Sequence, residues 1–469
     1  MSEHCGYVVR VENLRPHSNA DRLQIATFFG NDTCVGLDVV QGEIGIYFPS
    51  DLQLSVEFCD ENHMCHKRAD GTDDTGYLDR DKRNIRPIKL RGEKSDGIFV
   101  PLSAVVYTGV NLDELNIGDK IEMLNGHEIC CKYIPRGRTT STNRVSNKTR
   151  KKKKLIAPFF VEHTDTEQLN YNLNAFKPGD QIEITLKMHG TSMRTGYLPV
   201  FKGYKRTFLD KIFHREGKPI YEYDYISGTR RTVLENFEGG FYGSNAFRKQ
   251  HHDKFVGKLY KGEEIYYEVV GFTHTGAPIM AEGNNEKLGK DFVKQYGKTT
   301  VFSYGCEPDG CHDDELMKMT TNDNGDKLLS ISLRPQSDIY VYRMTMTNED
   351  GDVVEYSPDF MRYRCEQMGV KTVPVMWKGF IPAHTGDAAA IRLGQDAGAW
   401  IKEKAERFYD GPDPIGKTHI REGVVVRIVN RPKFTAFKHK GFSFKVLEGL
   451  IKDTAAEPDM EEAQEIEKE

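Results

Sequence analysis

The residue with the clearest chemical potential is Lys187, which is followed by Met188, His189 and Gly190. Nearby cations lower the pKa of a lysine because like charge disfavours the ammonium form, and a neutral lysine is a nucleophile. Apolar and polar residues alternate over 181–187, which predicts Lys187 at the end of a strand, off its apolar face. Taken alone, the segment is better explained as an ordinary lysine where a strand meets a turn.

Later segments favour a nucleophilic role for Lys187 over an ordinary strand-end lysine, because acids, aromatic residues and lysines follow it in a definite order. An acid lies among aromatic residues, a second aromatic segment follows, then a carboxylate enters an apolar strand, and a Lys-x-Lys pair comes last. These features lie at Glu268, Tyr342, Glu422, Lys438 and Lys440. Side chains two apart on a strand share a face, so the two lysines are expected to point the same way.

The elements that must position these residues differ between two parts of the chain. Before about residue 130, short alternating segments separated by Gly, Asn and Asp predict a small all-β unit, either a five-stranded barrel or a small sandwich. After residue 155 strands and helices mix, and the polar stretch 305–326 is expected to be a surface insertion. The clearest strands are predicted at 181–187, 264–271, 338–345 and 423–429, and the clearest helices at 358–368 and 387–408.

The composition predicts a folded, multidomain protein of the cytoplasm. The chain has 469 residues, enough for two to four domains, and 38% of them are hydrophobic, which excludes a wholly disordered chain. Its apolar runs are shorter than the roughly 18 residues of a membrane span, so we expect no membrane partner. No secretory signal follows Met1. The nine cysteines are irregularly spaced, which favours reduced thiols.

Charge is distributed unevenly along the chain, although its net value is only −5. The stretch 132–154 contains ten Lys or Arg and no acid, whereas 453–469 contains eight acids and one Lys. A basic block attracts polyanions such as a phosphate backbone, but a solvated interdomain linker explains it equally well. The acidic end is expected to be a disordered tail.

Taken in order, the segments from Lys187 to Lys440 resemble the motifs of the covalent nucleotidyltransferases, which include ligases and capping enzymes. The version here resembles the RNA ligases. His189 is similar to the residue that the RNA ligase 2 type carries in Lys-x-His-Gly, where DNA ligases usually carry Asp. The stretch 338–351 is similar to the phage RNA ligase 2 segment before the fourth motif.

The front of the chain resembles the N-terminal OB domain of the Deinococcus-type RNA ligases. The segments that carry this resemblance are His17–Leu23, Gly45–Pro49, Ile88–Gly92 and Ser95–Gly97. The two resemblances span about 1–125 and 180–449, and they imply an α+β fold. An OB-like β-barrel that binds nucleic acid would precede a mixed α/β, ATP-grasp-like nucleotidyltransferase core with antiparallel sheets. The domains expected are the OB-like domain at 1–130, a basic linker at 131–154, the core at 155–452 and an acidic tail at 453–469.

The resemblance implies that Lys187 takes AMP from ATP as a lysyl-AMP intermediate. AMP would then pass to an RNA 5′-phosphate, and a 3′-hydroxyl would expel it and seal the strand, in RNA repair or nick sealing. The resemblance also places His189 and Gly190 in the nucleotide motif, and Arg230, with Arg231 as its rival, in the motif that follows. It implies that Glu268 contacts the ribose of AMP and that Tyr342 stacks on adenine. Glu422 would help to hold a Mg²⁺ or Mn²⁺ ion, and Lys438 and Lys440 would contact the α-phosphate. Two positions depart from the phage pattern, Leu186 and Arg343.

Three alternatives stay open beside the RNA ligase. DNA nick sealing and GTP-dependent capping are disfavoured by His189 and by the 29 residues after Lys440, which leave no room for a further OB domain. A non-catalytic protein that binds RNA ends is disfavoured because binding alone needs no nucleophilic lysine. The substrate among nicked duplexes, broken tRNA and single strands is left open.

Overall fold

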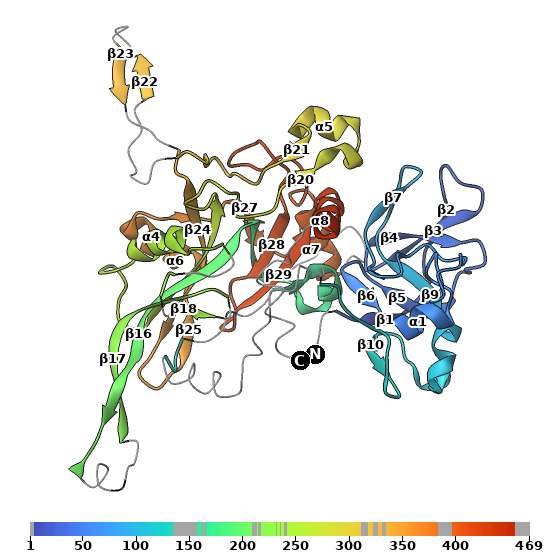
Figure 1. Cartoon of the computed structure of the whole chain (residues 1–469), viewed down its shortest axis with the longest axis horizontal. Helices are drawn as coiled ribbons and strands as arrows, with labels where there is room; N and C mark the ends of the chain where they lie inside the picture. Colours follow the sequence, from blue (N-terminus) through green and yellow to red (C-terminus); the bar gives the residue numbers. More distant parts are fainter. Residues whose placement is uncertain are drawn as a thin grey trace. The chain divides into compact units, whose positions relative to one another are not determined.

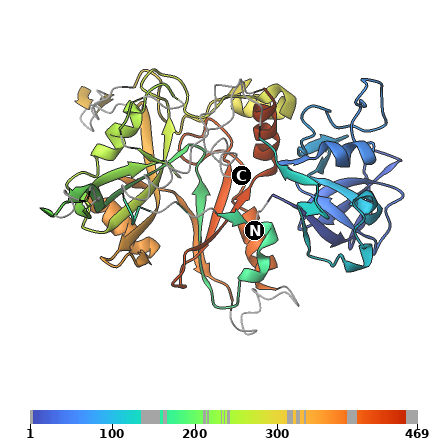
Figure 2. The same cartoon turned by 60° about the horizontal axis from the view of Figure 1, so that its bottom comes forward.

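The computed structural model divides the chain into two compact units (Figures 1 and 2). The first unit contains Met1–Thr139 and Lys445–Pro458, and the second contains Thr140–Phe444 and Asp459–Glu469. The structure describes residues 4–134, 157–160, 163, 166–208, 213, 217–230, 232–234, 236–238, 242–310, 318–321, 327–330, 334–382 and 396–454. Most of the basic stretch 131–154 and most of the acidic stretch 453–469 therefore lie outside the described residues.

The first unit is built mainly from short antiparallel strands. A four-stranded sheet has the order β10-β1-β5-β9, with β1 at Gly6–Arg10, β5 at Ile44–Phe48, β9 at Ile98–Pro101 and β10 at Lys120–Ile121. A three-stranded sheet contains β2 (Leu14–Pro16), β3 (Leu23–Phe28) and β4 (Asn31–Gly36). Three strand pairs join β6 (Leu52–Leu54) to β13 (Cys130–Lys132), β7 (Ile88–Leu90) to β8 (Glu93–Ser95), and β11 (Met123–Leu124) to β12 (His127–Glu128).

These strands confirm the predicted series of short antiparallel strands but not the expected barrel. Across residues 4–134 the strand pairs form separate sheets and no closed barrel. The unit also contains the helix α1 (Val56–Glu61) and the 3-10 helices η1 (Leu102–Thr108) and η2 (Leu112–Glu114). Strand β13 pairs with β6, so ordered structure continues past residue 130.

Polar contacts join the segments of the first unit that the sequence singled out. The His17 ring nitrogen Nε2 lies 3.1 Å from the carbonyl oxygen of Leu90, and Asn19 donates to the carbonyl of Arg91 at 3.0 Å. Asp96 is buried and pairs with Lys445 of the C-terminal helix, with 2.7 Å between Oδ2 and Nζ. The resembling segments thus contact one another and hold the unit together.

The second unit contains two larger sheets. The five-stranded sheet has the order β14-β29-β28-β15-β27, with β14 at Glu167–Gln168, β15 at Gln181–Lys187, β27 at Val375–Phe380, β28 at Gly423–Ile428 and β29 at Thr435–Lys440. The seven-stranded sheet runs β18-β17-β16-β19-β24-β25, with β26 also on β24. Its strands are β16 (Thr191–Lys205), β17 (Lys218–Gly228), β18 (Val233–Leu234), β19 (Glu263–Gly271), β24 (Ser337–Thr347), β25 (Val353–Glu355) and β26 (Lys371–Thr372). The strand pairs are antiparallel apart from β14 with β29 and β24 with β26.

Helices and short elements complete the second unit. Its helices are α4 (Ala246–Asp253), α5 (Lys290–Tyr296), α6 (Pro358–Met368), α7 (Ala397–Glu406) and the first turn of α8 (Phe442–Thr454), with the 3-10 helices η3 (Leu169–Tyr171), η4 (Leu173–Ala175) and η5 (Asn285–Leu288). The remaining strands are β20 (Gly283–Asn284), β21 (Thr299–Thr300), β22 (Lys318–Thr321) and β23 (Lys327–Ser330). No helix in the described part of the chain is long and apolar enough to cross a membrane.

The predicted strand at 181–187 is present with the same bounds, and its alternation explains why. Ile182 and Ile184 are fully buried in a core with Val424 and Val426 of β28. Because side chains alternate along a strand, this packing leaves Lys187 on the opposite face.

The polar stretch 305–326 was expected at the surface, and among its described residues 307–309 are exposed whereas Cys306 is buried. Cys306 is buried at 4% exposure, beside the equally buried Tyr304 that precedes the stretch. The Cys306 side chain lies against the end of β19, where Gly271 leaves room for it. Tyr304 and Cys306 therefore attach the start of this stretch to the core of the second unit.

Candidate active site

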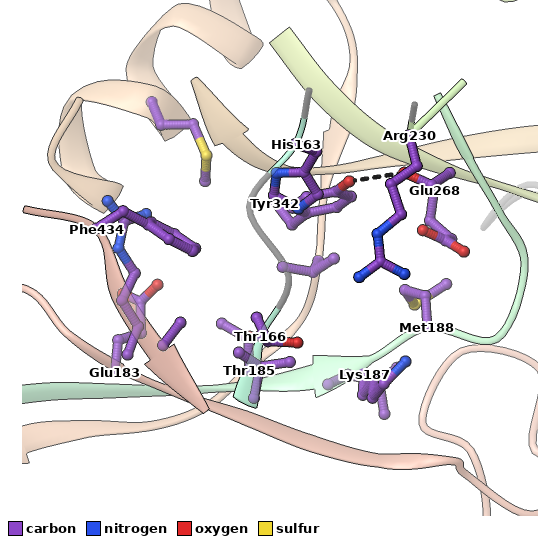
Figure 3. A pocket seen from close by; sticks show the side chains of 17 residues that line it. His163, Thr166, Glu183, Thr185, Lys187, Met188, Arg230, Glu268, Tyr342 and Phe434 are labelled. Carbon is purple, nitrogen blue, oxygen red and sulfur yellow. Dashed lines mark hydrogen bonds between the residues drawn. The ribbon is translucent and has the colours of Figure 1, made fainter. Parts of the chain in front are cut away.

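A cavity of about 150 Å³ lies between the two sheets of the second unit (Figure 3). Its lining includes Lys187 from β15, Glu268 from β19 and Tyr342 from β24, together with Arg230 just after β17 and His163 from the segment before β14. The lining also includes Ala436, so residues separated by up to 273 positions are brought to one place. The polar face of β15 forms one wall, as the alternation predicted.

Lys187 belongs to a cluster of charges at the end of β15. Its Nζ lies 2.9 Å from Glu422 Oε1, and Lys440 Nζ lies 3.3 Å from the same oxygen. Antiparallel pairing explains the arrangement because Gly423 of β28 is opposite both Lys187 and Lys440. Two ammonium groups thus share one carboxylate.

Glu422 is buried at 2% exposure, yet it remains ionised. Burial alone would raise its pKa, but the charges of Lys187 and Lys440 outweigh burial and hold the pKa well below its usual range. Its second oxygen, Oε2, has no hydrogen-bond partner among the described residues, and His189 Nδ1 lies 3.6 Å away. A buried carboxylate oxygen with unused acceptor capacity can take a further ligand.

The turn after Lys187 is fixed by contacts from outside the strands. The backbone N–H of His189 donates to the Tyr304 hydroxyl oxygen at 2.7 Å. The His189 ring stands edge-on to Phe302 and Phe444, with ring centroids 4.5 Å and 4.9 Å away. These contacts orient the imidazole toward Glu422 within the charge cluster.

Gly190 is required by the close approach of two strands. A Cβ at this position would lie 2.4 Å from the carbonyl oxygen of Val269 in β19. The next residue, Thr191, accepts a hydrogen bond from the buried Arg248 at 2.6 Å. Gly190 therefore lets β16 begin directly after the lysine-bearing turn.

The wall of the cavity opposite Lys187 comes from neighbouring strands of the seven-stranded sheet. Ser192 of β16 is opposite Glu268 of β19, and its Oγ lies 3.0 Å from the Tyr342 hydroxyl oxygen. Figure 3 shows Glu268 and Arg230 side by side, with the Arg230 guanidinium directed toward Lys187. A carboxylate, a guanidinium and an aromatic ring therefore face the lysine.

His163 is a site residue that the sequence did not indicate. Its ring centroid is 5.4 Å from that of Tyr342 and 5.1 Å from that of Tyr266. Burial, together with the charge of Arg343, lowers its pKa well below the usual range and keeps the ring neutral. Arg343 contacts His163 Nδ1 at 3.1 Å. No local signal identifies His163, because Arg343, Tyr342 and Tyr266 lie far from it in sequence.

The two departures from the phage pattern have structural explanations. Arg343 is buried and bonds both to His163 and to Glu355, its Nε lying 2.8 Å from Glu355 Oε1, so it supports the cavity wall. Leu186 is buried and lines the cavity beside Lys187. At Leu186 the cavity wall is therefore apolar.

Lys438 is one of the predicted residues that the structure places outside the cavity lining. It shares the face of β29 with Lys440, as predicted, and it is half-buried opposite Val425. Among the described residues, the cavity lining includes Lys187, Arg230, Glu268 and Tyr342. It does not include the other predicted site residues, which are His189, Gly190, Glu422, Lys438 and Lys440. Arg231, the rival of Arg230, lies outside the described residues.

The site offers a divalent ion one buried carboxylate rather than a complete set of protein ligands. Across the described residues, no group of three His, Cys, Asp or Glu side chains is arranged to hold a metal. Mg²⁺ and similar ions are often held by one or two carboxylates, water and substrate phosphate rather than by a cage of protein ligands. Glu422, with its unused buried oxygen, fits that role.

A family model for the RNA ligases matches residues 180–447, which is more than half of the chain. The chain therefore belongs to the RNA ligase family, and the predicted class of enzyme is confirmed. The matched segment contains every predicted site residue from Lys187 to Lys440.

Solved structures of Naegleria gruberi RNA ligase have a similar fold. A lysine variant with AMP and Mn has a TM-score of 0.53 at 15% identity, covering 95% of this chain and 98% of that chain. A lysine variant with ATP and Mn has a TM-score of 0.52 at 15% identity, covering 94% and 98%. A ligand-free variant has a TM-score of 0.53 at 16% identity, covering 95% and 98%. No curated protein matches the chain.

Proposed function

We propose that this RNA ligase uses ATP to form lysyl-AMP on Lys187, transfers AMP to an RNA 5′-phosphate and joins that end to a 3′-hydroxyl. The observation that carries the proposal is the Lys187 ammonium at the cavity edge, paired with the buried Glu422 beside Lys440. Binding RNA ends would not by itself require a lysine in this position.

In the first step the Lys187 amine attacks the α-phosphorus of ATP, an N–P bond forms and pyrophosphate leaves. The attacking lysine must first lose its proton. Glu422 is a poor acceptor for that proton because its pKa lies well below the usual range. Its role in the proposal is to position the ammonium groups of Lys187 and Lys440, while Lys440 and Arg230 offset phosphate charge.

The remaining residues are proposed to bind the nucleoside and the ion. Glu268 would accept hydrogen bonds from the ribose hydroxyls, and the rings of Tyr342 and His163 would contact adenine. Glu422 would hold a Mg²⁺ or Mn²⁺ ion through water, and such an ion neutralises developing charge on the phosphates when bound. The presence of ATP or AMP with Mn in the Naegleria structures supports these assignments.

We propose further that the first unit is an OB-like domain that binds RNA, with a basic linker at 131–154 and an acidic tail at 453–469. The short antiparallel strands of the unit and its resemblance to the Deinococcus-type domain support this assignment. A nicked duplex as substrate and a cytoplasmic location are likewise proposals.

The proposal is tested with ATP labelled at the α-phosphate and Mg²⁺, followed by a denaturing gel. We expect the wild-type chain to retain label and Lys187→Ala to retain none while its circular dichroism is unchanged. Lys378→Ala is the matched control because this lysine is 64% exposed on the adjacent strand β27. Label on the Lys187→Ala variant would refute the assignment.

Two further outcomes separate the alternatives. No label on the folded wild-type chain from either ATP or GTP would favour a protein that binds RNA ends. Label from GTP in place of ATP would favour capping chemistry.

A further inference from the structure

Strands β16 and β17 extend well beyond the sheet to which they belong (Figure 1). Strand β19 pairs with β16 only over Thr191–Gly196, and β18 pairs with β17 only at Ser227 and Gly228. Within the described residues, Tyr197–Lys205 and Lys218–Ile226 pair only with each other. We call this two-stranded part the distal ribbon. A lone strand pair is marginally stable in water, so its side chains must stabilise it or bind something.

One face of the distal ribbon is aromatic along its length. Directly paired residues share a face, and the pairs Tyr197 with Tyr225 and Phe201 with Tyr221 place four rings on it. The Tyr197 and Tyr225 rings stack at 4.5 Å, and those of Phe201 and Tyr221 are 5.9 Å apart. Tyr223 and Tyr204 continue the same face, and the Tyr204 centroid is 5.0 Å from that of Phe201.

These rings are only half-buried, although they pack on one another. Tyr197 and Tyr225 reach the core of the second unit, whereas Phe201, Tyr204 and Tyr221 lie further out. A series of partly exposed rings on one face presents several flat surfaces to solvent. Such surfaces accept the planar bases of a single strand without sequence preference.

The outer end of the distal ribbon is basic in a chain whose net charge is −5. Lys205, Arg206 and Lys218 are exposed there, and Phe208 beside them is 78% exposed. The sequence from 201 to 218 contains six Lys or Arg and two acids. Lys205 and Lys218 are directly paired and, by alternation from Tyr221, point to the face opposite the rings at the last pair of the ribbon. A single strand with bases on the rings and phosphates on these lysines would therefore pass around the end of the ribbon.

The distal ribbon is continuous with the candidate active site. Strand β16 begins directly after the turn that follows Lys187, and β17 leads into Arg230 in the cavity lining. A strand rises roughly 3.3 Å per residue, so the 13 steps from Ser192 to Lys205 span about 43 Å. Strands β16 and β17 therefore run from the cavity at Lys187, where the RNA end would react, to the outer end of the distal ribbon.

We propose that the distal ribbon binds a single-stranded segment of the RNA substrate, with phosphates on Lys205, Arg206 and Lys218 and bases on the aromatic face. This inference rests on the proposed function, because the occupant is the RNA whose end lies at Lys187. The distal ribbon would bind the RNA at some distance from the end that is held at Lys187 and joined. The ligase would therefore favour RNA that has a single-stranded region near that end.

The test compares binding of a fluorescent single-stranded 24-mer RNA by two full-length variants over a range of salt concentrations. The first variant replaces Lys205, Arg206 and Lys218 with Gln. The second, a control with the same charge change, replaces the exposed Lys287, Lys290 and Lys294 with Gln. Each phosphate contact on a single strand contributes about 0.7 to the salt slope, so we expect the first variant alone to lose about 2 from the slope and at least tenfold in affinity.

The aromatic contribution at the outer end of the ribbon is tested with Phe208→Ser, which removes an exposed ring beyond the aromatic face and leaves the packing of the strand pair intact. We expect affinity for the 24-mer to fall roughly tenfold, within the range measured for loss of one stacked base. Equal affinity and equal salt slope in the wild type and in both distal-ribbon variants would overturn the proposal. So would a loss confined to fully duplex RNA.

Self-adenylylation with labelled ATP is measured on the same samples. We expect it to be unchanged in all variants because none of these residues lines the cavity. Adenylylation with no effect of the variants on RNA binding would refute the distal-ribbon proposal and leave the ligase assignment standing. Absence of adenylylation in the wild type, with RNA binding that still depends on the ribbon, would instead refute the proposed function.

Discussion

The backbone of the lysine-bearing turn is held by a side chain 115 positions away. The Tyr304 hydroxyl oxygen accepts the His189 N–H at 2.7 Å, and the Tyr304 ring packs against that of His419 at 4.5 Å. Burial raises the pKa of the Tyr304 hydroxyl well above its usual range, so the group stays neutral. Tyr304 acts on the turn through His189 and is therefore a positioning residue.

We expect Tyr304→Phe to slow lysyl-AMP formation roughly tenfold. The ring and its packing remain, but the partly buried His189 N–H loses its acceptor, which costs about 1–2 kcal/mol. The measurement is the single-turnover rate with labelled ATP, together with the nucleotide concentration at half-maximal rate. A positioning role predicts a lower maximal rate with little change in that concentration.

Tyr296→Phe is the control, because Tyr296 is also buried in the same part of the chain but packs against Phe292 away from the site. Equal rates for the two variants would show that the Tyr304 hydroxyl does not position the turn.

At the residue scale, the sequence predicted which side chains share a face of a strand, because local periodicity determines this. The two-residue period of 181–187 placed Lys187 off the apolar face, and β15 has that arrangement. Tyr304 and His163 could not be predicted, since their partners are brought to them by pairing of distant strands. The spacing of Phe302 and Tyr304 was the available signal, and both residues lie just before the stretch 305–326 that was expected at the surface.

At the element scale, helix α4 is attached to the seven-stranded sheet through buried polar side chains. His251 is 1% exposed, and its Nε2 lies 2.9 Å from Ser337 Oγ at the start of β24. Burial, with a smaller contribution from Lys254, lowers the pKa of His251 to about 3. The helix therefore packs on the sheet with a neutral imidazole.

This pKa makes a prediction for stability against pH. In the unfolded chain His251 binds a proton near its ordinary pKa of about 6.5, whereas in the folded chain it does so only near 3. Its contribution is therefore fully present above pH 6.5 and is lost as the pH falls from 6.5 toward 3. We expect His251→Gln to remove about 2 kcal/mol of the loss in unfolding free energy between pH 7 and pH 5.

The measurement is urea-induced unfolding of wild type and variant at both pH values. His127→Gln is the control because the His127 side chain is 35% exposed. If wild type and His251→Gln lose the same free energy between pH 7 and pH 5, His251 does not have the lowered pKa.

Elements with their own end signals were predicted best. The bounds of α6 are those expected at 358–368, because Ser357 caps its first turn, Pro358 begins it and Gly369 ends it in the left-handed conformation. The barrel expected in the first unit had no such support. Closure depends on pairing between strands far apart in sequence, and alternation within each strand does not specify it.

At the scale of the whole molecule, the C-terminal helix belongs to both units. Helix α8 begins at Phe442 within the second unit, and from Lys445 onward its residues belong to the first. Lys445 Nζ lies 2.7 Å from Asp96 Oδ2, and the two side chains are 19% and 5% exposed. The chain thus returns to the first unit five residues after Lys440, which local sequence patterns could not indicate.

We expect Lys445→Met to destabilise the first unit by about 3 kcal/mol, because the Asp96 carboxylate would stay buried without its partner. The double variant Lys445→Met with Asp96→Asn should recover more than half of that loss, since it leaves no buried charge.

Both tryptophans, Trp377 and Trp400, lie in the second unit, so their fluorescence reports its unfolding while circular dichroism follows the whole chain. Lys445→Met should therefore move the circular dichroism transition to lower urea and separate it from the fluorescence transition. If the double variant is no more stable than Lys445→Met, the buried ion pair does not hold the helix in the first unit.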